Sequence, residues 1–289
     1  MIGHRLRFLL VVSGLAASVT LGQDNEAFRR MNQPMEPFRI AGNLYYVGAS
    51  DVTAYLVTTG EGHILLDTGF KGTVPIIRAN VKKLGFALSD IKVLLNTHAH
   101  IDHAGGLAEL KELTGAKLMA MDDDVPQLRA GGKGDYAYGD SIPFPVVTLD
   151  RILHDGDKVA LGDVEMVAHK TPGHTRGCTT WTMKVRDGEK TCDVVFIGSP
   201  TLNPNTRLSG NEKYPNVVAD YRKGFEVLKA LKCDIFLGAH GSYFDMADKI
   251  KRREADPTVN PFIDPTGYRK FIEVHEQRFL DQLKSEAAT

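Results

Sequence analysis

Three histidines and one aspartate lie within six consecutive positions of the sequence. His98, His100, Asp102 and His103 follow directly after the apolar run 93–95. Imidazole nitrogens and carboxylate oxygens are the ligands that suit zinc in a catalytic site. With ten histidines in the chain, chance clustering is the alternative, but an interleaved aspartate at the end of an apolar run argues against it. We therefore expect a metal site here.

The spacing within this cluster indicates two neighbouring metal ions. His98 and His100 are two residues apart, so on an extended segment they point the same way. Asp102 and His103 follow where the chain must turn, and the two glycines after Ala104 let the backbone bend into a helix. One short segment could thus supply ligands to both ions.

Two further histidines, His174 and His240, each follow a strand-like run. Alone, each is more often an ordinary histidine than a ligand. Ligands in open α/β architectures, however, gather beyond the carboxyl ends of strands, and both histidines occupy such places. Two groups of ligands can then be assembled: His98, His100 and His174 with an open fourth position, and Asp102, His103 and His240. Two zinc ions held in this way could share a hydroxide that acts as the nucleophile.

The composition is that of an ordinary globular protein. The 289 residues are 43% hydrophobic and 25% charged, and the net charge is −1. Nucleic acid is not expected as a partner, because phosphate binding needs a positive surface.

The N-terminus reads as a secretory signal peptide. A positively charged start precedes an apolar run over residues 8–21, which is short for a membrane span. An uncleaved anchor is the alternative. We expect export to the periplasm, no stable membrane association after cleavage, and a monomer. The expected divisions are a signal peptide (1–22), a flexible lead-in (23–37) and one catalytic domain (38–289).

Strand-like and helical runs alternate along the chain, which indicates an α/β fold. Strands are expected over residues 43–47, 54–59, 63–67, 91–95, 117–121, 158–161, 164–169, 179–185, 193–197 and 234–237, and helices over 74–84, 107–113, 221–231 and 268–283. Residues 122–145 are rich in Asp, Gly and Pro and are expected to form a long loop, either a functional rim or a plain surface connection. Both halves contain strands, a helix and a strand that ends in histidine, so we expect two packed halves with the site between them.

The segment 98–103 matches the His-x-His-x-Asp-His motif of the metallo-β-lactamase superfamily, and the chain resembles this family from about residue 38 to the end. The segment Asp67-Thr68-Gly69, His174 and His240 fall in the family's order. The resemblance implies a four-layer αββα sandwich with two Zn²⁺ ions at one edge of its sheets.

Within the superfamily the chain resembles class B β-lactamases of the third subclass. Members similar to glyoxalase II and lactonases usually carry a bridging Asp where this chain has Ser199, and β-lactamases of the first subclass have Arg in place of His103 and Cys in place of Ser199. The run 174–181 is similar to the His-Thr-Pro-Gly-Ser-Thr-x-Trp run of the third subclass, although Arg176 and Cys178 depart from it.

This resemblance implies a function. We expect a periplasmic di-zinc β-lactamase that hydrolyses the amide bond of penicillins, cephalosporins and carbapenems by a zinc-bound hydroxide, with Asp102 orienting the nucleophile. The alternatives are another zinc hydrolase of the superfamily, a lactonase or thioesterase, and a non-catalytic periplasmic zinc-binding protein.

The resemblance also implies residues that contact the substrate. Ser199 and Thr201 would bind its carboxylate, and Asn205 would hydrogen-bond the lactam carbonyl. The segment 199–208 is about one residue longer than in some relatives, and ordinary turn residues are the alternative for Thr201 and Asn205.

The three cysteines leave at least one thiol unpaired. Cys233 resembles a family cysteine whose usual partner near the C-terminus is missing here. Cys192 and Cys233 stand at equal offsets before Ser199 and His240, so a bond between them is the alternative.

Overall fold

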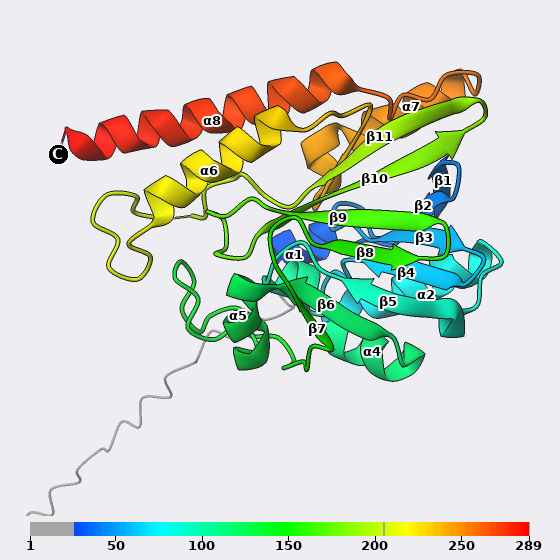
Figure 1. Cartoon of the computed structure of the whole chain (residues 1–289), viewed down its shortest axis with the longest axis horizontal. Coiled ribbons are helices and arrows are strands. Elements are labelled where there is room, and N and C mark those ends of the chain that lie inside the picture. The colour runs from blue at the N-terminus through cyan, green and yellow to red at the C-terminus, as the bar shows by residue number, and fades with distance from the viewer. Residues whose placement is uncertain (1–25, 205, 289) are drawn as a thin grey trace, which may run out of the picture.

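Two β-sheets form the centre of the molecule in the computed structural model, which describes residues 26–204 and 206–288 (Figure 1). The first sheet has the strand order β1-β2-β3-β4-β5-β6-β7. Its first four strands are antiparallel, whereas β4, β5, β6 and β7 run parallel to one another. The strands are β1 Phe38–Ala41, β2 Leu44–Tyr46, β3 Tyr55–Thr59, β4 Gly62–Leu66, β5 Ile91–Leu95, β6 Lys117–Met121 and β7 Arg151–Leu153.

The second sheet has the order β12-β11-β10-β9-β8. Its strands are antiparallel except for the parallel pair β11 and β12. Consequently β9, β11 and β12 all end at the same edge. The strands are β8 Lys158–Leu161, β9 Val164–Lys170, β10 Thr179–Asp187, β11 Lys190–Ile197 and β12 Ile235–Gly238.

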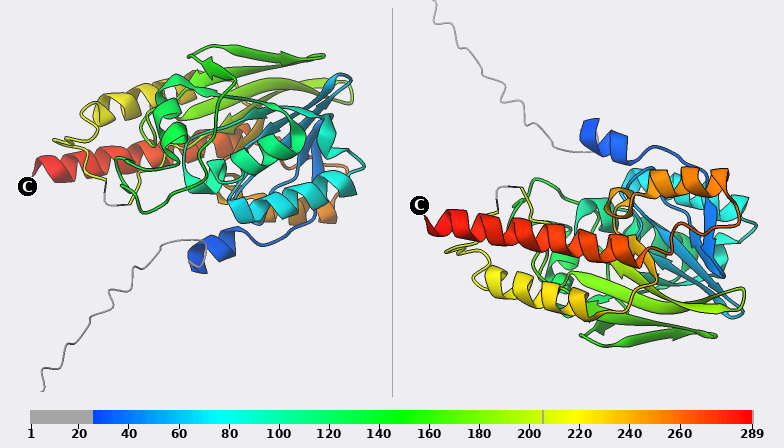
Figure 2. Two further views of the ribbon diagram at one scale, coloured as in Figure 1. Left: turned by 90° about the horizontal axis from the view of Figure 1, so that it is seen from below. Right: turned by 90° about the horizontal axis from the view of Figure 1, so that it is seen from above.

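Helices cover the outer face of each sheet, so the layers run helix, sheet, sheet, helix (Figures 1 and 2). Helices α6 and α8 lie over the second sheet, and α2 and α4 lie over the first. This is the expected four-layer αββα sandwich. The helices are α1 Glu26–Met31, α2 Val74–Lys83, α3 Ile101–Ala104, α4 Leu107–Thr114, α5 Val125–Ala130, α6 Val217–Ala230, α7 Met246–Ala255 and α8 Pro265–Ala287.

Apolar periodicity accounts for the helices that the sequence predicted. In α2, Val74, Ile77 and Val81 are fully buried against the first sheet, because residues three and four apart share one helix face. The helix ends near Gly85, whose φ of +86° favours glycine.

The two sheets pack through a layer of large aromatic side chains. Tyr55 on β3 meets Phe196 on β11 edge to face, with ring centroids 5.0 Å apart. Trp181 on β10 is fully buried, and its indole nitrogen donates to the Asn96 carbonyl at 3.1 Å. This hydrogen bond fixes the second sheet to the chain just after β5, where the histidine cluster begins.

The prediction of an unbroken long loop was wrong, and several short elements were not predicted. The long loop predicted over 122–145 contains a 3-10 turn, Asp122–Asp124, and helix α5. Pro126 stands in the first turn of that helix, where its missing N–H costs nothing, and Leu128 is fully buried. The lead-in expected over 23–37 contains α1, whose Phe28 packs on Phe70. Strands β1 and β7 and helix α7 were not predicted, because they are short or strongly charged.

The alternative of a Cys192–Cys233 disulfide was also wrong, since both thiols are free. The predicted alignment is present, because Val194 pairs with Ile235 and the two cysteines each stand two residues earlier. Cys192 is buried in the core, and half-buried Cys233 packs against the same cluster of side chains.

The predicted signal peptide, residues 1–22, lies outside the described residues. Within 26–204 and 206–288, no helix is both long and apolar enough to cross a membrane.

Replacing Trp181 with Phe tests the contact between the sheets. The variant should lower the free energy of unfolding by about 1–3 kcal/mol, because the Asn96 carbonyl loses its buried donor and a small cavity opens. Urea unfolding should be followed by circular dichroism. Tryptophan fluorescence cannot be used, because Trp181 is the only tryptophan and the variant lacks it. Val274→Ala, on the exposed face of α8, is the control and should change little. Equal stability of W181F and the unmodified protein would contradict the assigned role.

Candidate metal centre

The predicted ligands lie just beyond the carboxyl ends of three strands. β5 leads to His98 and His100, β9 leads to His174, and β12 leads to His240. Since β9 and β12 end at the same edge of the second sheet, both later histidines meet the segment that leaves the first sheet.

The structure brings these side chains into two groups whose ligand atoms lie within 4.8 Å of one another. We call them the three-histidine group (His98, His100 and His174) and the aspartate group (Asp102, His103 and His240). These are the two sets expected from the sequence.

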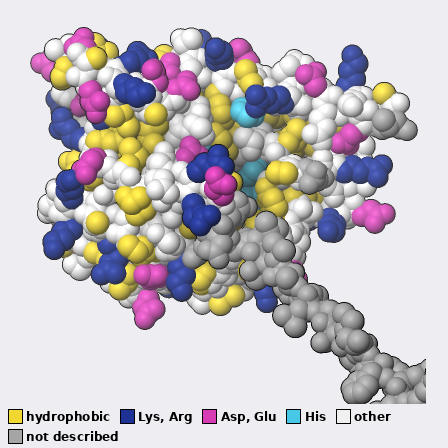
Figure 3. Space-filling model, turned by 180° about the vertical axis from the view of Figure 1, so that it is seen from behind, with side chains coloured by type: hydrophobic (Ala, Val, Ile, Leu, Met, Phe, Trp, Pro, Cys, Tyr) yellow, Lys and Arg dark blue, Asp and Glu magenta, His cyan; other side chains and the backbone are white. Residues whose placement is uncertain are grey.

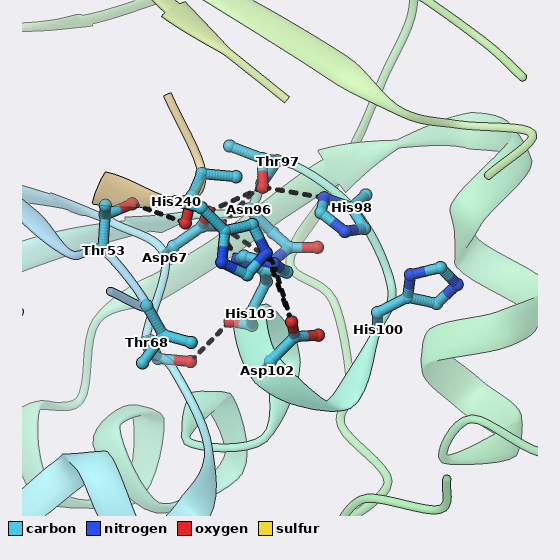
Figure 4. A network of polar contacts seen from close by, with 12 residues as sticks. Thr53, Asp67, Thr68, Asn96, Thr97, His98, His100, Asp102, His103 and His240 are labelled. Atoms are coloured by element: carbon cyan, nitrogen blue, oxygen red, sulfur yellow. Dashed lines mark hydrogen bonds and ion pairs between the residues drawn. The ribbon is translucent and has the colours of Figure 1, made fainter. Parts of the chain in front are cut away.

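Distances within each group are short. His100 Nδ1 lies 3.1 Å from His174 Nε2 in the three-histidine group. In the aspartate group, His103 Nε2 lies 3.3 Å from His240 Nε2, and both nitrogens lie within 3.4 Å of the Asp102 carboxylate. Figure 4 shows His240, His103 and Asp102 together, with His98 and His100 beside them. The two groups adjoin, because the rings of His98 and His103 are 4.2 Å apart.

A one-turn helix, α3, places Asp102 and His103. The His103 carbonyl accepts from both the backbone N–H and the hydroxyl of Thr68, at 3.1 and 2.9 Å. Gly106 permits this close approach, since a Cβ there would lie 2.7 Å from the Thr68 carbonyl. The Asp-Thr-Gly segment after β4 therefore holds the backbone of the aspartate group in place through Thr68.

The outward nitrogen of each histidine faces an oxygen atom. His98 Nδ1 faces the Thr97 hydroxyl at 3.1 Å, and His174 Nδ1 faces the Thr201 carbonyl at 2.8 Å. The other three face carboxylates: His240 Nδ1 is 3.0 Å from Asp51, His100 Nε2 is 3.4 Å from Asp135, and His103 Nδ1 is 3.4 Å from Asp67.

These contacts select the tautomer of each imidazole. The remaining nitrogen, which points into the group, is Nδ1 for His100 and Nε2 for the other four histidines. The separations at His100 and His103 exceed a normal hydrogen bond, so for these two the carboxylate faces the ring nitrogen without a close hydrogen bond.

Burial and neighbouring charges set different protonation in the two groups. Burial and the adjacent imidazoles hold the pKa of His98 well below its usual range, and the same causes lower the pKa of His174 to about 3. Burial also opposes protonation of His240, but its contacts with Asp102 and Asp51 raise its pKa to about 9. Burial would raise the pKa of Asp102, yet its contacts with His103 and His240 hold it well below the usual value.

The donor set fits a metal ion in both groups. In the three-histidine group, one nitrogen from each ring converges on the same point, and lone pairs brought together in this way repel one another unless a cation lies between them. In the aspartate group, an ionised carboxylate faces two imidazoles that hold protons, and a divalent cation can take the place of such protons. Both donor types are those that zinc prefers.

The predicted substrate-binding residues lie beside the three-histidine group. Ser199 Oγ is 3.0 Å from Thr201 Oγ1 and 3.0 Å from the Tyr243 hydroxyl. Thr201 Oγ1 lies 3.3 Å from His174 Nδ1. Ser199 is only 2% exposed, so Thr201 is the more accessible of the two. Asn205, the third predicted contact, lies outside the described residues.

Several side chains around the site were not predicted. Asp51, Asp124 and Asp135 are polar contacts of the ligand histidines or their loops, and Tyr243 reaches Ser199. Asp124 and Asp135 lie in the segment expected to be a loop. The sequence signal that could have identified Asp51 and Asp124 is an aspartate close after a strand.

In the space-filling view, histidine atoms lie at the surface between hydrophobic patches (Figure 3).

Solved structures similar to this chain are metallo-β-lactamases. The native FEZ-1 metallo-β-lactamase of Legionella gormanii is 46% identical, with a TM-score of 0.87 over 90% of this chain and 99% of that one. The class B3 di-zinc metallo-β-lactamase LRA-12, from an Alaskan soil metagenome, is 37% identical, with a TM-score of 0.84 over 90% and 97% of the two chains.

Curated relatives include hydroxyacylglutathione hydrolases. The enzyme of Hyphomonas neptunium is 31% identical over 51% of this chain and 49% of its own length, and that of Rhodospirillum rubrum is 33% identical over 36% and 32%. The matches thus span a third to a half of the length of these two enzymes. The model of the metallo-β-lactamase superfamily matches residues 47–240, more than half of the chain. The chain therefore belongs to the metallo-β-lactamase superfamily of hydrolases.

Proposed function

We propose that this protein is a periplasmic di-zinc β-lactamase that acts as a monomer. The observation that carries the proposal is the pairing of a three-histidine group with an Asp-His-His group beside Ser199, in a chain that is 46% identical to FEZ-1 along 99% of that enzyme. LRA-12 is a di-zinc enzyme, and this similarity supports two zinc ions here.

The residues of the two groups have different roles in the proposed reaction. When bound, the two zinc ions would lower the pKa of a coordinated water and so supply a hydroxide nucleophile at neutral pH. Asp102 stays ionised because its contacts keep its pKa low. It can therefore accept a hydrogen bond from the attacking water and hold it toward the lactam carbonyl. His98 and His174 stay neutral because their pKa values are held low, and with His100 they would hold one of the two ions.

A thioesterase function is the second candidate, because hydroxyacylglutathione hydrolases are among the relatives. Two observations favour the β-lactam. The matches to those enzymes cover at most about half of their length, whereas FEZ-1 is matched almost completely. Moreover, a serine stands at position 199, where glyoxalase II-like members usually carry a bridging aspartate. Its hydroxyl, with that of Thr201, can donate to the carboxylate that most β-lactams carry.

Removal of metal tests the zinc requirement. Dialysis against a chelator should abolish hydrolysis of nitrocefin, and added Zn²⁺ should restore it, with two ions bound per chain. His100→Ala should lower kcat/KM by more than about 100-fold and reduce the bound zinc. His154→Ala is the matched control, because that side chain is 69% exposed and belongs to neither ligand group. Full activity of H100A would refute the zinc mechanism.

The substrate class can be decided by direct comparison. A penicillin, a carbapenem, a homoserine lactone and a glutathione thioester should be assayed with the same zinc-loaded preparation. We expect kcat/KM for the lactams to exceed that for the thioester by at least about 100-fold. A preparation that retains two zinc ions but prefers the thioester would establish the second candidate.

Thr201→Val tests the carboxylate contact. Valine keeps the shape and the backbone carbonyl that His174 needs, but it removes the hydroxyl. KM for penicillins should rise about 10-fold with little change in kcat, because a hydrogen bond to a charged group is lost in both the ground state and the transition state. Thr191→Val, at the opposite end of β11 and exposed, is the control. Unchanged KM in T201V would exclude this contact.

A further inference from the structure

Each metal group unites side chains from the two halves of the chain. His98 and His100 follow β5 in the first sheet, but His174 follows β9 in the second. Likewise Asp102 and His103 belong to the first half, and His240 follows β12. Each group therefore exists only if a loop of one sheet is held at a fixed distance from a loop of the other.

One buried carboxylate spans this gap at the three-histidine group. Asp124, 2% exposed, ends the 3-10 turn after β6. Its Oδ2 accepts from the backbone N–H of Ala99 and from the hydroxyl of Thr175, both at 2.9 Å. Its Oδ1 accepts from the backbone N–H of Gly177 at 2.8 Å. Ala99 lies between the two ligands of the first half, and Thr175 is next to His174.

The packing around Asp124 leaves little freedom. A Cβ at Gly177 would lie 2.8 Å from the Asp124 side chain, so the two loops approach as closely as a glycine allows. Both carboxylate oxygens are occupied by donors of the chain, and Asp124 belongs to neither ligand group. Its role must therefore lie in the position of the loops.

A second carboxylate does the same at the aspartate group. Asp51 follows β2 in the first sheet. Its Oδ2 lies 3.0 Å from His240 Nδ1, and its Oδ1 accepts from the backbone N–H of Ser242 at 2.7 Å. The Asp51 carbonyl accepts from the N–H of Gly241, also at 2.7 Å. The loop that carries His240 is thus bound on three successive residues.

We propose that Asp124 and Asp51 are positioning residues, each of which assembles one metal group independently of the other. This inference rests on the proposed metal-binding function. It predicts that each substitution acts on one group only. Loss of the Asp124 carboxylate weakens metal binding by the three-histidine group, and loss of the Asp51 carboxylate weakens metal binding by the aspartate group.

Asparagine substitutions test the carboxylate specifically, because they replace it with an amide of nearly the same volume. In Asp124→Asn, the single oxygen can replace only one carboxylate oxygen. The amide NH₂ then faces the N–H of either Gly177 or Ala99, and one bond between the loops is lost. In Asp51→Asn, an NH₂ that faces His240 Nδ1 selects the tautomer with its proton on Nε2, the nitrogen that points into the group.

The test is metal binding resolved by site. Metal-free protein is titrated with Cd²⁺, and the two sites are followed by ¹¹³Cd NMR, which distinguishes a site with three nitrogens from a site with two nitrogens and a carboxylate. Competition with a chelator gives the affinity of each. We expect D124N to weaken the three-histidine site about 10- to 100-fold and to leave the aspartate site within about threefold. D51N should give the reverse.

Each variant is the control for the other, and Asp123→Asn is the control for the turn. Asp123 is exposed and pairs with Lys170, so D123N should leave both sites unchanged. Thr175→Val removes one of the three donors and keeps both N–H bonds to Asp124. If D124N fails to fold, the T175V variant provides the test, with an expected loss of affinity of about five- to tenfold at the three-histidine site alone.

The outcomes separate the inference from the function on which it rests. If the unmodified protein binds fewer than two ions, the proposed di-zinc function fails. If it binds two, but D124N and D51N weaken both sites equally or neither, the positioning roles are overturned while the proposed function stands. Loss of affinity at the three-histidine site alone in D124N, and at the aspartate site alone in D51N, establishes the positioning roles.

Discussion

The metal centre depends on a crowding of acceptor atoms that would repel one another in isolation. Imidazole nitrogens from three different segments face each other at little more than 3 Å, in a largely buried site. Two features make this tolerable. Each outward nitrogen has an oxygen partner that fixes the ring, and the sandwich holds the segments at one edge. A rigid frame of two packed sheets is therefore a requirement of the chemistry and not only a support for it.

The frame and the site are coupled at a few points. Trp181 crosses from the second sheet to the carbonyl of Asn96, two residues before the first ligand. Asp67, with a φ of +59°, accepts from the N–H and the hydroxyl of Thr97 at 2.7 and 2.6 Å. The strained backbone of Asp67 is thus stabilised by bonds to the same segment. Trp181 is a core residue that contacts the segment carrying the ligands. Substitutions in the core should therefore also change the positions of the ligands.

The sequence was sufficient to predict the fold class and the division of six side chains into two groups. His174 and His240 could be assigned because each follows a strand, and strand ends converge. The aspartates around them could not be assigned in this way. Asp124 bonds to Gly177 across more than fifty positions, and no periodicity links such residues. Helix α5 was missed because Gly and Pro nearby suggested a loop, although Leu128 is buried against the core.

The orientation of the five imidazoles has a consequence for the exchange of ligands. His100 presents Nδ1, which lies close to the backbone, whereas the other four present Nε2, which lies about one bond length or more further out. The amide oxygen of asparagine falls near the position of Nδ1, and that of glutamine near the position of Nε2. Position 100 would therefore keep a donor in place with asparagine, and positions 98, 103, 174 and 240 with glutamine. The same chemical replacement is thus conservative at one ligand and disruptive at its neighbour two residues away.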